Sequence, residues 1–250
     1  MQVLRAALFN LLFWLWSVLM VVALLPAAPF LRPEGVRAYA RFWERGIHLL
    51  LRLIVGLRHE VRGAPPAEPC LLAAKHQSAW ETLALHVIVP NLAVGLKEEL
   101  TRIPLFGWYL MKTQNIRIDR GGAAAALRSL VAGAKAALDQ GLHVLVFPEG
   151  TRRPPGAPPD YKVGVAALYL QLGVPCVPIA LNSGVFWGRR AFLKRPGTII
   201  VEFLEPIPPG LKRAEFMRLL EERIETATAR LVAEAEGGTA GPDSIGVRAA

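Results

Sequence analysis

The sequence of 250 residues contains only two cysteines and has no familiar metal-ligand or nucleotide-binding pattern. Cys70 and Cys176 are too few and too far apart for a disulfide-framed secreted module or a thiolate zinc site. Neither a Walker A sequence nor Gly-x-Gly-x-x-Gly occurs, and none of the five serines lies in Gly-x-Ser-x-Gly. We therefore expect no metal, no cofactor and no serine-hydrolase nucleophile.

Acidic residues are scarce relative to basic ones. Lys and Arg total 29 against 20 for Asp and Glu, which gives a net charge of +9 and a pI of about 10.1. Hydrophobic residues make up 53% and the mean hydropathy is +0.34, too high for a disordered chain. A basic chain binds nucleic acid, a membrane surface or an anionic substrate. Because this chain is also hydrophobic, we expect membrane lipids as partners and no nucleic acid.

The first long hydrophobic run extends from Ala6 to Leu25 and contains no charged residue. About 20 apolar residues in a helix match a hydrocarbon core of roughly 30 Å, so the run predicts a transmembrane helix. A cleaved signal peptide is the alternative, although the run is longer than the usual apolar region of one. Arg5 alone precedes the run, whereas four arginines follow it closely: Arg32, Arg37, Arg41 and Arg45. The positive-inside rule then places the remaining chain on the cytoplasmic side of the inner or plasma membrane.

Residues 36–57 show a second pattern, with apolar side chains at helical spacing and basic ones opposite them. The apolar face comprises Tyr39, Trp43, Ile47, Leu50, Ile54 and Leu57. The opposite face comprises Arg37, Arg41, Arg45, His48 and Arg52. Such a helix is typical of one that lies on anionic lipid. The alternative is a helix that packs on the globular domain.

From residue 58 onward, short apolar runs alternate with helical patterns. The predicted strands are Leu71–Ala74, Leu92–Leu96, Asn115–Ile118, His143–Phe147, Cys176–Leu181 and Thr198–Phe203. The predicted helices are Ala79–Val89, Gly122–Gln140, Val163–Leu172 and Ala214–Glu236. This alternation predicts an α/β fold with a mostly parallel central sheet covered by helices. We therefore expect membrane-associating helices over 1–57, a globular domain over 58–236 and a flexible tail over 237–250.

His76 and Glu81 form the first candidate site, just after a predicted strand. On one continuous helix, residues five apart diverge by about 140° around the axis. The divergence disappears if the helix starts at Ser78, because Ser78 and Glu81 then form a capping box and His76 lies in the entering loop. Both side chains would then meet at the helix N-terminus. The alternative is that Glu81 only caps the helix and His76 is incidental.

The second motif, Phe147-Pro148-Glu149-Gly150-Thr151-Arg152, ends another predicted strand. The carboxyl end of a strand is where open α/β sheets bind ligands. Gly150 permits close backbone approach, and the planar guanidinium of Arg152 suits a phosphate. The alternative is an ordinary exit turn with a solvated arginine.

Three weaker blocks accompany these two motifs within residues 70–182. They are Gln114-Asn115-Ile116-Arg117-Ile118-Asp119-Arg120, Tyr161-Lys162-Val163-Gly164 and Val177-Pro178-Ile179. Together with the His-x-x-x-x-acid and Phe-Pro-Glu-Gly-Thr-Arg motifs, and in this order, they resemble the glycerolipid acyltransferase family, specifically the 1-acyl-sn-glycerol-3-phosphate acyltransferases. The resemblance makes 58–236 an acyltransferase domain.

The sequence departs from the family pattern at four positions. The acid of the first motif is Glu81 where Asp is usual, and Lys75 stands where Asn commonly precedes the histidine. Gln114 and Arg117 replace the usual Gly and Phe of a Gly-x-x-Phe-Ile-x-Arg block. We expect acyl transfer to be preserved despite these changes, whereas the lysolipid that is used follows less directly from the resemblance.

The residue types indicate how acyl transfer would proceed. His76 would act as general base toward an acceptor hydroxyl that attacks an acyl thioester, and Glu81 would orient the imidazole. Arg120 and Arg152 would bind the acceptor phosphate. The resemblance places Glu149, Gly150 and Thr151 in the same site. Two further candidates lie nearby: Lys97, a third cation or merely a solvated lysine, and Trp80, which lines an acyl groove or, the interpretation we favour, the core.

The resemblance implies esterification of the sn-2 hydroxyl of lysophosphatidic acid (1-acylglycerol 3-phosphate), giving phosphatidic acid. The donor would be acyl-CoA or an acylated acyl carrier protein. One alternative is the same fold acting on another lysolipid, such as a lyso-ornithine lipid. The other is a non-catalytic lipid-binding membrane protein, against which the His76–Glu81 pair argues. Acyl-chain length, donor carrier and oligomeric state stay open.

Overall fold

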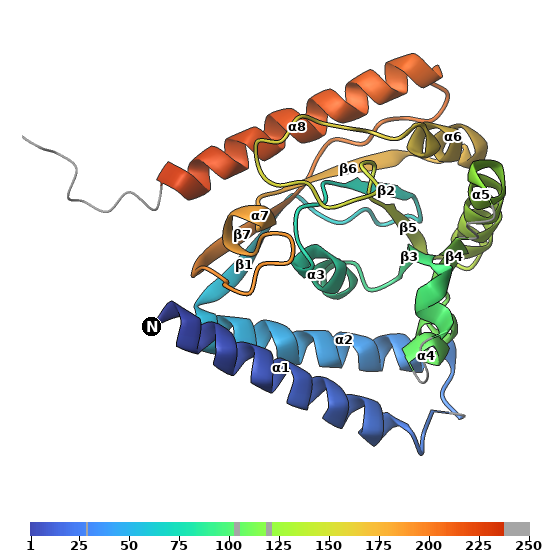
Figure 1. Cartoon of the computed structure of the whole chain (residues 1–250). Coiled ribbons are helices and arrows are strands. Elements are labelled where there is room, and N and C mark those ends of the chain that lie inside the picture. The colour runs from blue at the N-terminus through green and yellow to red at the C-terminus, as the bar shows by residue number, and fades with distance from the viewer. Residues whose placement is uncertain (29, 103–105, 119–121, 238–250) are drawn as a thin grey trace, which may run out of the picture.

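The protein folds as a seven-stranded sheet between two layers of helices (Figure 1). The structure, a computed structural model, describes residues 1–28, 30–102, 106–118 and 122–237. The strands are β1 (Leu57–Arg62), β2 (Leu71–Ala74), β3 (Leu92–Lys97), β4 (Ile116–Ile118), β5 (His143–Val146), β6 (Cys176–Leu181) and β7 (Gly197–Phe203). The α-helices are α1 (Gln2–Leu24), α2 (Pro33–Leu50), α3 (Trp80–Ile88), α4 (Phe106–Lys112), α5 (Ala123–Asp139), α6 (Val163–Leu172), α7 (Ser183–Phe186) and α8 (Arg213–Gly237). A π-helical segment (Leu51–Val55) and a 3₁₀ segment (Glu98–Arg102) complete the described elements.

The strand order is β1-β7-β6-β2-β5-β3-β4, and every neighbouring pair is parallel except β6 with β7. The predicted α/β fold with a mostly parallel sheet is confirmed. Each predicted strand and helix of the domain is present, with its ends shifted by no more than one residue. Because β6, β2 and β5 are adjacent and parallel, the chain leaves all three at the same edge of the sheet. The loops that follow these strands therefore meet there.

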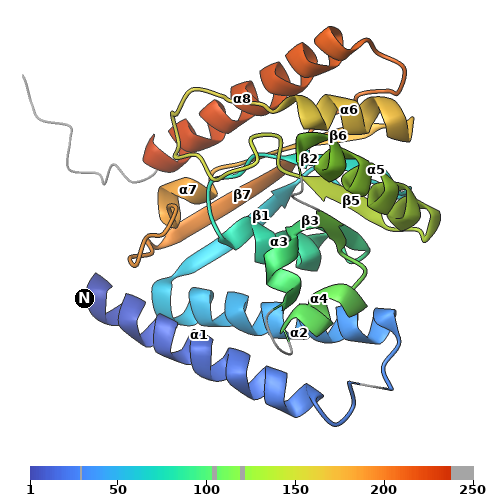
Figure 2. The ribbon, with the colours of Figure 1, turned by 45° about the vertical axis from the view of Figure 1, so that its right-hand side comes forward.

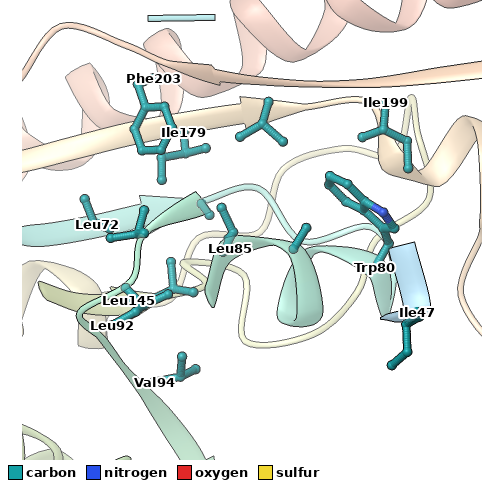
Figure 3. Packing of buried hydrophobic residues seen from close by; sticks show 14 of the residues in the cluster. Ile47, Leu72, Trp80, Leu85, Leu92, Val94, Leu145, Ile179, Ile199 and Phe203 are labelled. Carbon is teal, nitrogen blue, oxygen red and sulfur yellow. The ribbon is translucent and has the colours of Figure 1, made fainter. Parts of the chain in front are cut away.

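Alternating side chains of the central strands pack into two separate cores. In β2, Leu72 and Ala74 point into the layer that contains α3, whereas Leu71 and Ala73 point into the layer of α5, α6 and α8. Figure 3 shows the first core, in which Trp80 and Leu85 of α3 pack against strand residues. Trp80 is only 1% exposed, so the favoured interpretation of Trp80 as a core residue agrees with the structure.

Helix α2 lies between α1 and α3, so its apolar face is covered by protein (Figures 1 and 2). Ile47 is fully buried, Trp43 and Leu50 are partly buried against the α3 core, and Arg37 on the predicted basic face is buried too. The expectation of an interfacial helix whose apolar face lies on lipid is therefore wrong for α2. The alternative, a helix packed on the domain, is what the structure shows. Amphipathicity alone does not distinguish the two, because either environment selects the same pattern.

The predicted helical run to residue 57 is also too long. Gly56 takes a left-handed conformation with φ 77°, which ends the helical segment, and Leu57 already pairs with Gly197 in the sheet. Glycine just past a helix end is a common termination signal, because it has no Cβ to oppose positive φ. Leu57 therefore lies in β1, a strand that the sequence analysis did not predict.

Helix α1 exposes a long apolar face and is fastened to the domain on its other side. Its window of mean hydropathy 2.2 and its length suffice to cross a membrane, and only 17% of that window is buried. The exposed side chains include Leu4, Leu8, Leu11, Leu15, Val18, Leu19 and Val22. On the other side, Trp16 Nε1 donates to the carbonyl of Trp43 at 2.9 Å, and Tyr39 Oη donates to that of Met20 at 2.7 Å. These bonds hold α1 along α2.

Candidate active site

His76 and Glu81, expected to meet, lie in hydrogen-bond contact at the edge where β2 ends. His76 Nδ1 is 3.0 Å from Glu81 Oε1. Helix α3 begins at Trp80, so His76 lies in the preceding loop and Glu81 in the first turn. The capping arrangement is close to the expected one: Glu81 Oε1 accepts the backbone N–H of Ser78 at 2.6 Å, and Ser78 Oγ accepts that of Trp80.

The carboxylate of Glu81 is fully buried and saturated with donors. Besides His76 and Ser78, its Oε1 accepts the backbone N–H of Gln77, and its Oε2 accepts the hydroxyl of Ser183 at 2.8 Å. A buried carboxylate costs several kcal/mol unless such partners satisfy it. These bonds fix the rotamer of Glu81, so that His76 Nδ1 donates its proton to a stationary acceptor.

The imidazole of His76 is held on its face as well as at its edge. Its ring stacks on that of Phe147, with 3.9 Å between centroids and 20° between planes. Since Nδ1 faces Glu81, the remaining nitrogen, Nε2, is free of this contact and is left as a proton acceptor. The side chain is 11% exposed, so the ring keeps a small opening to the outside.

The loop after β5 is joined to the histidine loop through the backbone. The N–H of Arg153 donates to the carbonyl of His76 at 2.8 Å. Gly150 takes φ 64°, a left-handed turn that admits glycine readily. Arg153 is occupied by an ion pair with Asp160 at 2.7 Å, whereas Arg152 forms no ion pair with any described residue. Of these two arginines, Arg152 is therefore the one available to an anion.

A buried lysine next to the histidine binds two carboxylates. Lys75 Nζ lies 2.9 Å from Glu149 Oε1 and 2.7 Å from Glu225 Oε1 on α8. Tyr161 Oη donates to the same oxygen of Glu225 at 2.9 Å. Burial raises the pKa of Glu149, while Lys75 opposes that rise and Glu225 adds to it. Burial and the charge of Glu225 also raise the pKa of Tyr161, which keeps its phenol protonated.

Of the other predicted site residues, the structure describes Glu149, Gly150 and Thr151 in full. Glu149 is only 1% exposed and faces Lys75, whereas Gly150 and Thr151 are exposed at the loop surface. Arg120 lies outside the described residues. Lys97 is the last residue of β3, and its side chain is not among those that the structure describes.

Two departures from the family pattern lie at the sheet edge around β4. Gln114 takes φ 65°, a left-handed conformation that suits the glycine usual in the family. Its side chain accepts a hydrogen bond from buried Arg37 of α2 and donates one to Gln140. Arg117 is exposed on β4. Gln114 thus joins α2 to the end of α5.

Sequence reasoning placed Glu149 in the site, but it did not identify the stacking of Phe147 on His76 or the contacts of Ser183 and Glu225. Ser183 lies two residues after the end of β6, so the rule that ligand sites form at strand carboxyl ends would have indicated this region. Glu225 has no such signal, because it lies within an otherwise ordinary charged helix. Among the residues that the structure describes, no group of three or more His, Cys, Asp or Glu side chains is placed to hold a metal ion.

Comparison with known proteins shows that the chain is similar to acyltransferases in sequence and in fold. Residues 58–182 match the family model described as Acyltransferase. A 1-acyl-sn-glycerol-3-phosphate acyltransferase of Pseudomonas aeruginosa is 39% identical over 210 residues, which cover 80% of this chain and 79% of that protein. One from Limnanthes alba is 30% identical over 77% of this chain and 67% of that protein. The crystal structure of the 1-acyl-sn-glycerophosphate (LPA) acyltransferase PlsC from Thermotoga maritima has the same fold, with a TM-score of 0.76 at 22% identity over 93% of this chain and 98% of that one.

Replacing Lys75 by Met should destabilise the fold in a pH-dependent way. The change leaves Glu149 without its buried counter-charge, which typically costs about 3 kcal/mol or more. A carboxyl whose pKa is raised in the folded state keeps its proton while the unfolded state loses one. The free energy of unfolding therefore falls as pH rises above the ordinary value of 4.5. Urea unfolding of wild type and variant at pH 5 and pH 8 measures this difference.

Two controls separate the buried ion pair from a general loss of charge. Adding Glu225→Gln to Lys75→Met removes one of the two carboxylates and should recover part of the stability at pH 8. Arg218→Met breaks an exposed pair with Glu222, and such pairs contribute about 1 kcal/mol or less. An equal loss for Lys75→Met at both pH values, with no recovery in the double variant, would contradict this account.

Proposed function

The chain belongs to the acyltransferase family, and we propose that it transfers a fatty acyl group from a thioester to the sn-2 hydroxyl of 1-acylglycerol 3-phosphate, giving phosphatidic acid. The observation that carries this proposal is the contact between His76 and buried Glu81, beside a loop that presents Arg152. The names of the Pseudomonas aeruginosa and Limnanthes alba relatives support this acceptor.

His76 is the proposed general base. Its Nε2 takes the proton of the acceptor hydroxyl as that oxygen attacks the thioester carbonyl carbon. The tetrahedral intermediate then collapses, the C–S bond breaks, and the leaving thiolate takes the proton back from the imidazolium. General base catalysis of this kind typically contributes 10²–10⁴-fold. No covalent acyl-enzyme is required, so neither buried cysteine needs to react.

Glu81 is the proposed positioning residue for that base. Its carboxylate holds the Nδ1 proton of His76, which leaves Nε2 unprotonated, and it stabilises the imidazolium that forms during the reaction. Ser183 and the backbone of residues 77 and 78 hold the carboxylate in turn.

Arg152 is the proposed phosphate ligand, together with Arg120 and with Lys97 as a third cation. A guanidinium can bind a phosphate through two parallel hydrogen bonds, which fixes the orientation of the acceptor as well as its position. Gly150 and Thr151 are proposed to line the same site from the exposed part of the loop. Glu149, buried against Lys75, would act by holding this loop in place.

We also propose that residues 1–57 attach the protein to the cytoplasmic face of the inner or plasma membrane. The exposed apolar face of α1 supports this attachment, because such a face in water would be a costly hydrophobic patch. Since hydrophobic burial is insensitive to ionic screening, the full-length protein should remain in the membrane fraction after a high-salt wash. Its release by salt alone, monitored by immunoblot, would contradict this attachment.

Two variants test the catalytic roles. His76→Ala should abolish turnover, because no other group described in the site replaces the base. Glu81→Gln keeps the shape but loses the counter-charge of the imidazolium, and kcat should fall by about 10³-fold or more. Ser183→Ala removes one of the bonds to Glu81 and should cost far less. Circular dichroism checks folding, and a folded Glu81→Gln variant with kcat near wild type would refute the assignment.

An acyl-transfer competition tests the acceptor. Lysophosphatidic acid and lyso-ornithine lipid are offered at equal concentration in detergent micelles, with acyl-CoA and with acylated acyl carrier protein in parallel. We expect lysophosphatidic acid to be acylated, because an acceptor without a phosphate leaves the cations of the site unpaired. Preferential acylation of the ornithine lipid would favour the alternative acceptor, and binding without turnover would favour the non-catalytic lipid-binding protein.

Arg152→Lys supplies the matched control for the same assay. Lysine keeps the charge but not the planar pair of donors, so KM for lysophosphatidic acid should rise on the order of tenfold while KM for the donor stays unchanged. A variant that weakens only the donor would place Arg152 in the donor site.

A further inference from the structure

The loop between α7 and β7, residues 187–196, combines basic and apolar side chains and contains no acidic residue. Its sequence is Trp-Gly-Arg-Arg-Ala-Phe-Leu-Lys-Arg-Pro. No Asp or Glu occurs anywhere between Asp160 and Glu202, so these cations have no acidic neighbours along the chain. The proposed acyl transfer assigns no role to this loop.

Two large apolar side chains project from the α7–β7 loop into solvent. Phe192 is 52% exposed and Leu193 is 43% exposed. The loop is nevertheless well anchored: Arg195 N donates to the carbonyl of Phe186 at 2.8 Å, and Ala191 N donates to that of Gly188. The apolar tip is therefore held outward by an ordered loop.

Three arginines flank this tip in the sequence, and all of them are exposed. Among the residues that the structure describes, Arg189, Arg190 and Arg195 form no ion pair; the guanidinium of Arg189 makes one long contact, 3.5 Å, to the carbonyl of Arg152. Elsewhere on the surface, arginines such as Arg62 and Arg230 pair with glutamates. Exposed apolar side chains flanked in the sequence by exposed guanidinium groups are complementary to a bilayer surface with anionic headgroups.

The fourth cation fastens the loop to α1. Lys194 is 5% exposed, and its Nζ donates to Asn10 Oδ1 at 2.8 Å. The same ammonium lies 5.1 Å from the ring centroid of Phe9 and 4.9 Å from that of Trp187. Figures 1 and 2 both show the loop beside the N-terminal end of α1. The loop therefore lies against α1, the helix whose exposed apolar face is proposed to enter the membrane.

We propose that the α7–β7 loop is a second membrane contact, in which Phe192 and Leu193 enter the headgroup–acyl boundary of an anionic bilayer and Arg190 and Arg195 bind lipid phosphates. The loop starts from α7, whose Ser183 holds Glu81, and Arg189 reaches back to Arg152. Insertion would therefore bring the bilayer surface to the site where the acceptor is proposed to bind. The insertion itself does not depend on the proposed reaction.

Depth-dependent fluorescence tests the insertion directly. Phe192→Cys in the full-length protein is labelled with an environment-sensitive dye and mixed with vesicles of phosphatidylcholine and phosphatidylglycerol. The labelling is selective because Cys70 and Cys176 are both buried and burial raises the pKa of each thiol. We expect a blue shift of the emission and quenching by lipids that carry a nitroxide on the upper acyl chain.

Ala214→Cys, exposed on α8 on the far side of the sheet from α1, is the matched control and should show neither effect (Figure 1). Emission from position 192 that matches the control would overturn the proposal, even if α1 still held the protein on the vesicles. Quenching at both positions would also overturn it, because adsorption would then lack the orientation that the loop requires.

A charge test addresses the arginines. Arg190→Gln/Arg195→Gln should weaken binding to the anionic vesicles on the order of tenfold and leave binding to pure phosphatidylcholine vesicles unchanged. Lys212→Gln/Arg213→Gln removes two exposed charges from the start of α8 and should change neither. If the two double variants weakened vesicle binding equally, net charge alone would explain the effect, and the proposal would be overturned. Acylation of a short-chain soluble acceptor should be unaffected in both, so that loss of the chemistry remains distinguishable from loss of the membrane contact.

Discussion

The buried carboxylate of Glu81 is the constraint on which the site depends. A carboxylate withdrawn from water must be compensated, and here the compensation comes from the loop before α3, from His76 and from Ser183 after β6. Two neighbouring parallel strands, β2 and β6, deliver these groups to one edge of the sheet. Satisfying the carboxylate therefore also fixes the histidine, because the same oxygen accepts both the capping N–H groups and the imidazole proton.

Short-range sequence patterns predicted the secondary structure and the one side-chain contact that neighbouring residues determine. Strands β2 to β7 and helices α3, α5, α6 and α8 followed from apolar runs and helical spacing, whereas β1, α4 and α7 were not predicted. The meeting of His76 and Glu81 followed from where α3 had to start. The contact of Ser183 with Glu81 spans 102 positions of sequence, so no local pattern predicts it, and only the position of Ser183 after the end of β6 points to this region. The environment of α2 was ambiguous for a different reason: lipid and a protein core select the same apolar face. Gly56 did carry a local signal for the start of β1, and a reading of glycine as a helix terminator would have found it.

Lys75 shows how a departure from a family pattern can be absorbed by its surroundings. An ammonium buried at 3% exposure needs negative partners, and Glu149 and Glu225 supply them from β5's exit loop and from α8. Glu149 belongs to the motif that resembles the family, so its position is tied to the loop that carries Arg152. Because Glu225 comes from α8, the packing of that helix bears on the loop that carries Arg152 through Lys75 and Tyr161. A neutral residue at position 75 would remove the counter-charge that these two carboxylates share.

The backbone bond between Arg153 and His76 links recognition to chemistry. It joins the loop of the proposed phosphate ligand to the loop of the proposed base, over 2.8 Å and without an intervening side chain. This bond sets the main-chain positions of the two loops relative to each other, whereas the long side chain of Arg152 keeps its own rotamers. An acceptor can place its phosphate on the arginine and its hydroxyl near Nε2 only if these groups are spaced to match. In lysophosphatidic acid the two groups lie on adjacent carbons of glycerol, with the phosphate on carbon 3 and the hydroxyl on carbon 2. Under the proposed function, selectivity for such an acceptor would depend on how this backbone bond spaces the two loops as well as on the charge of Arg152.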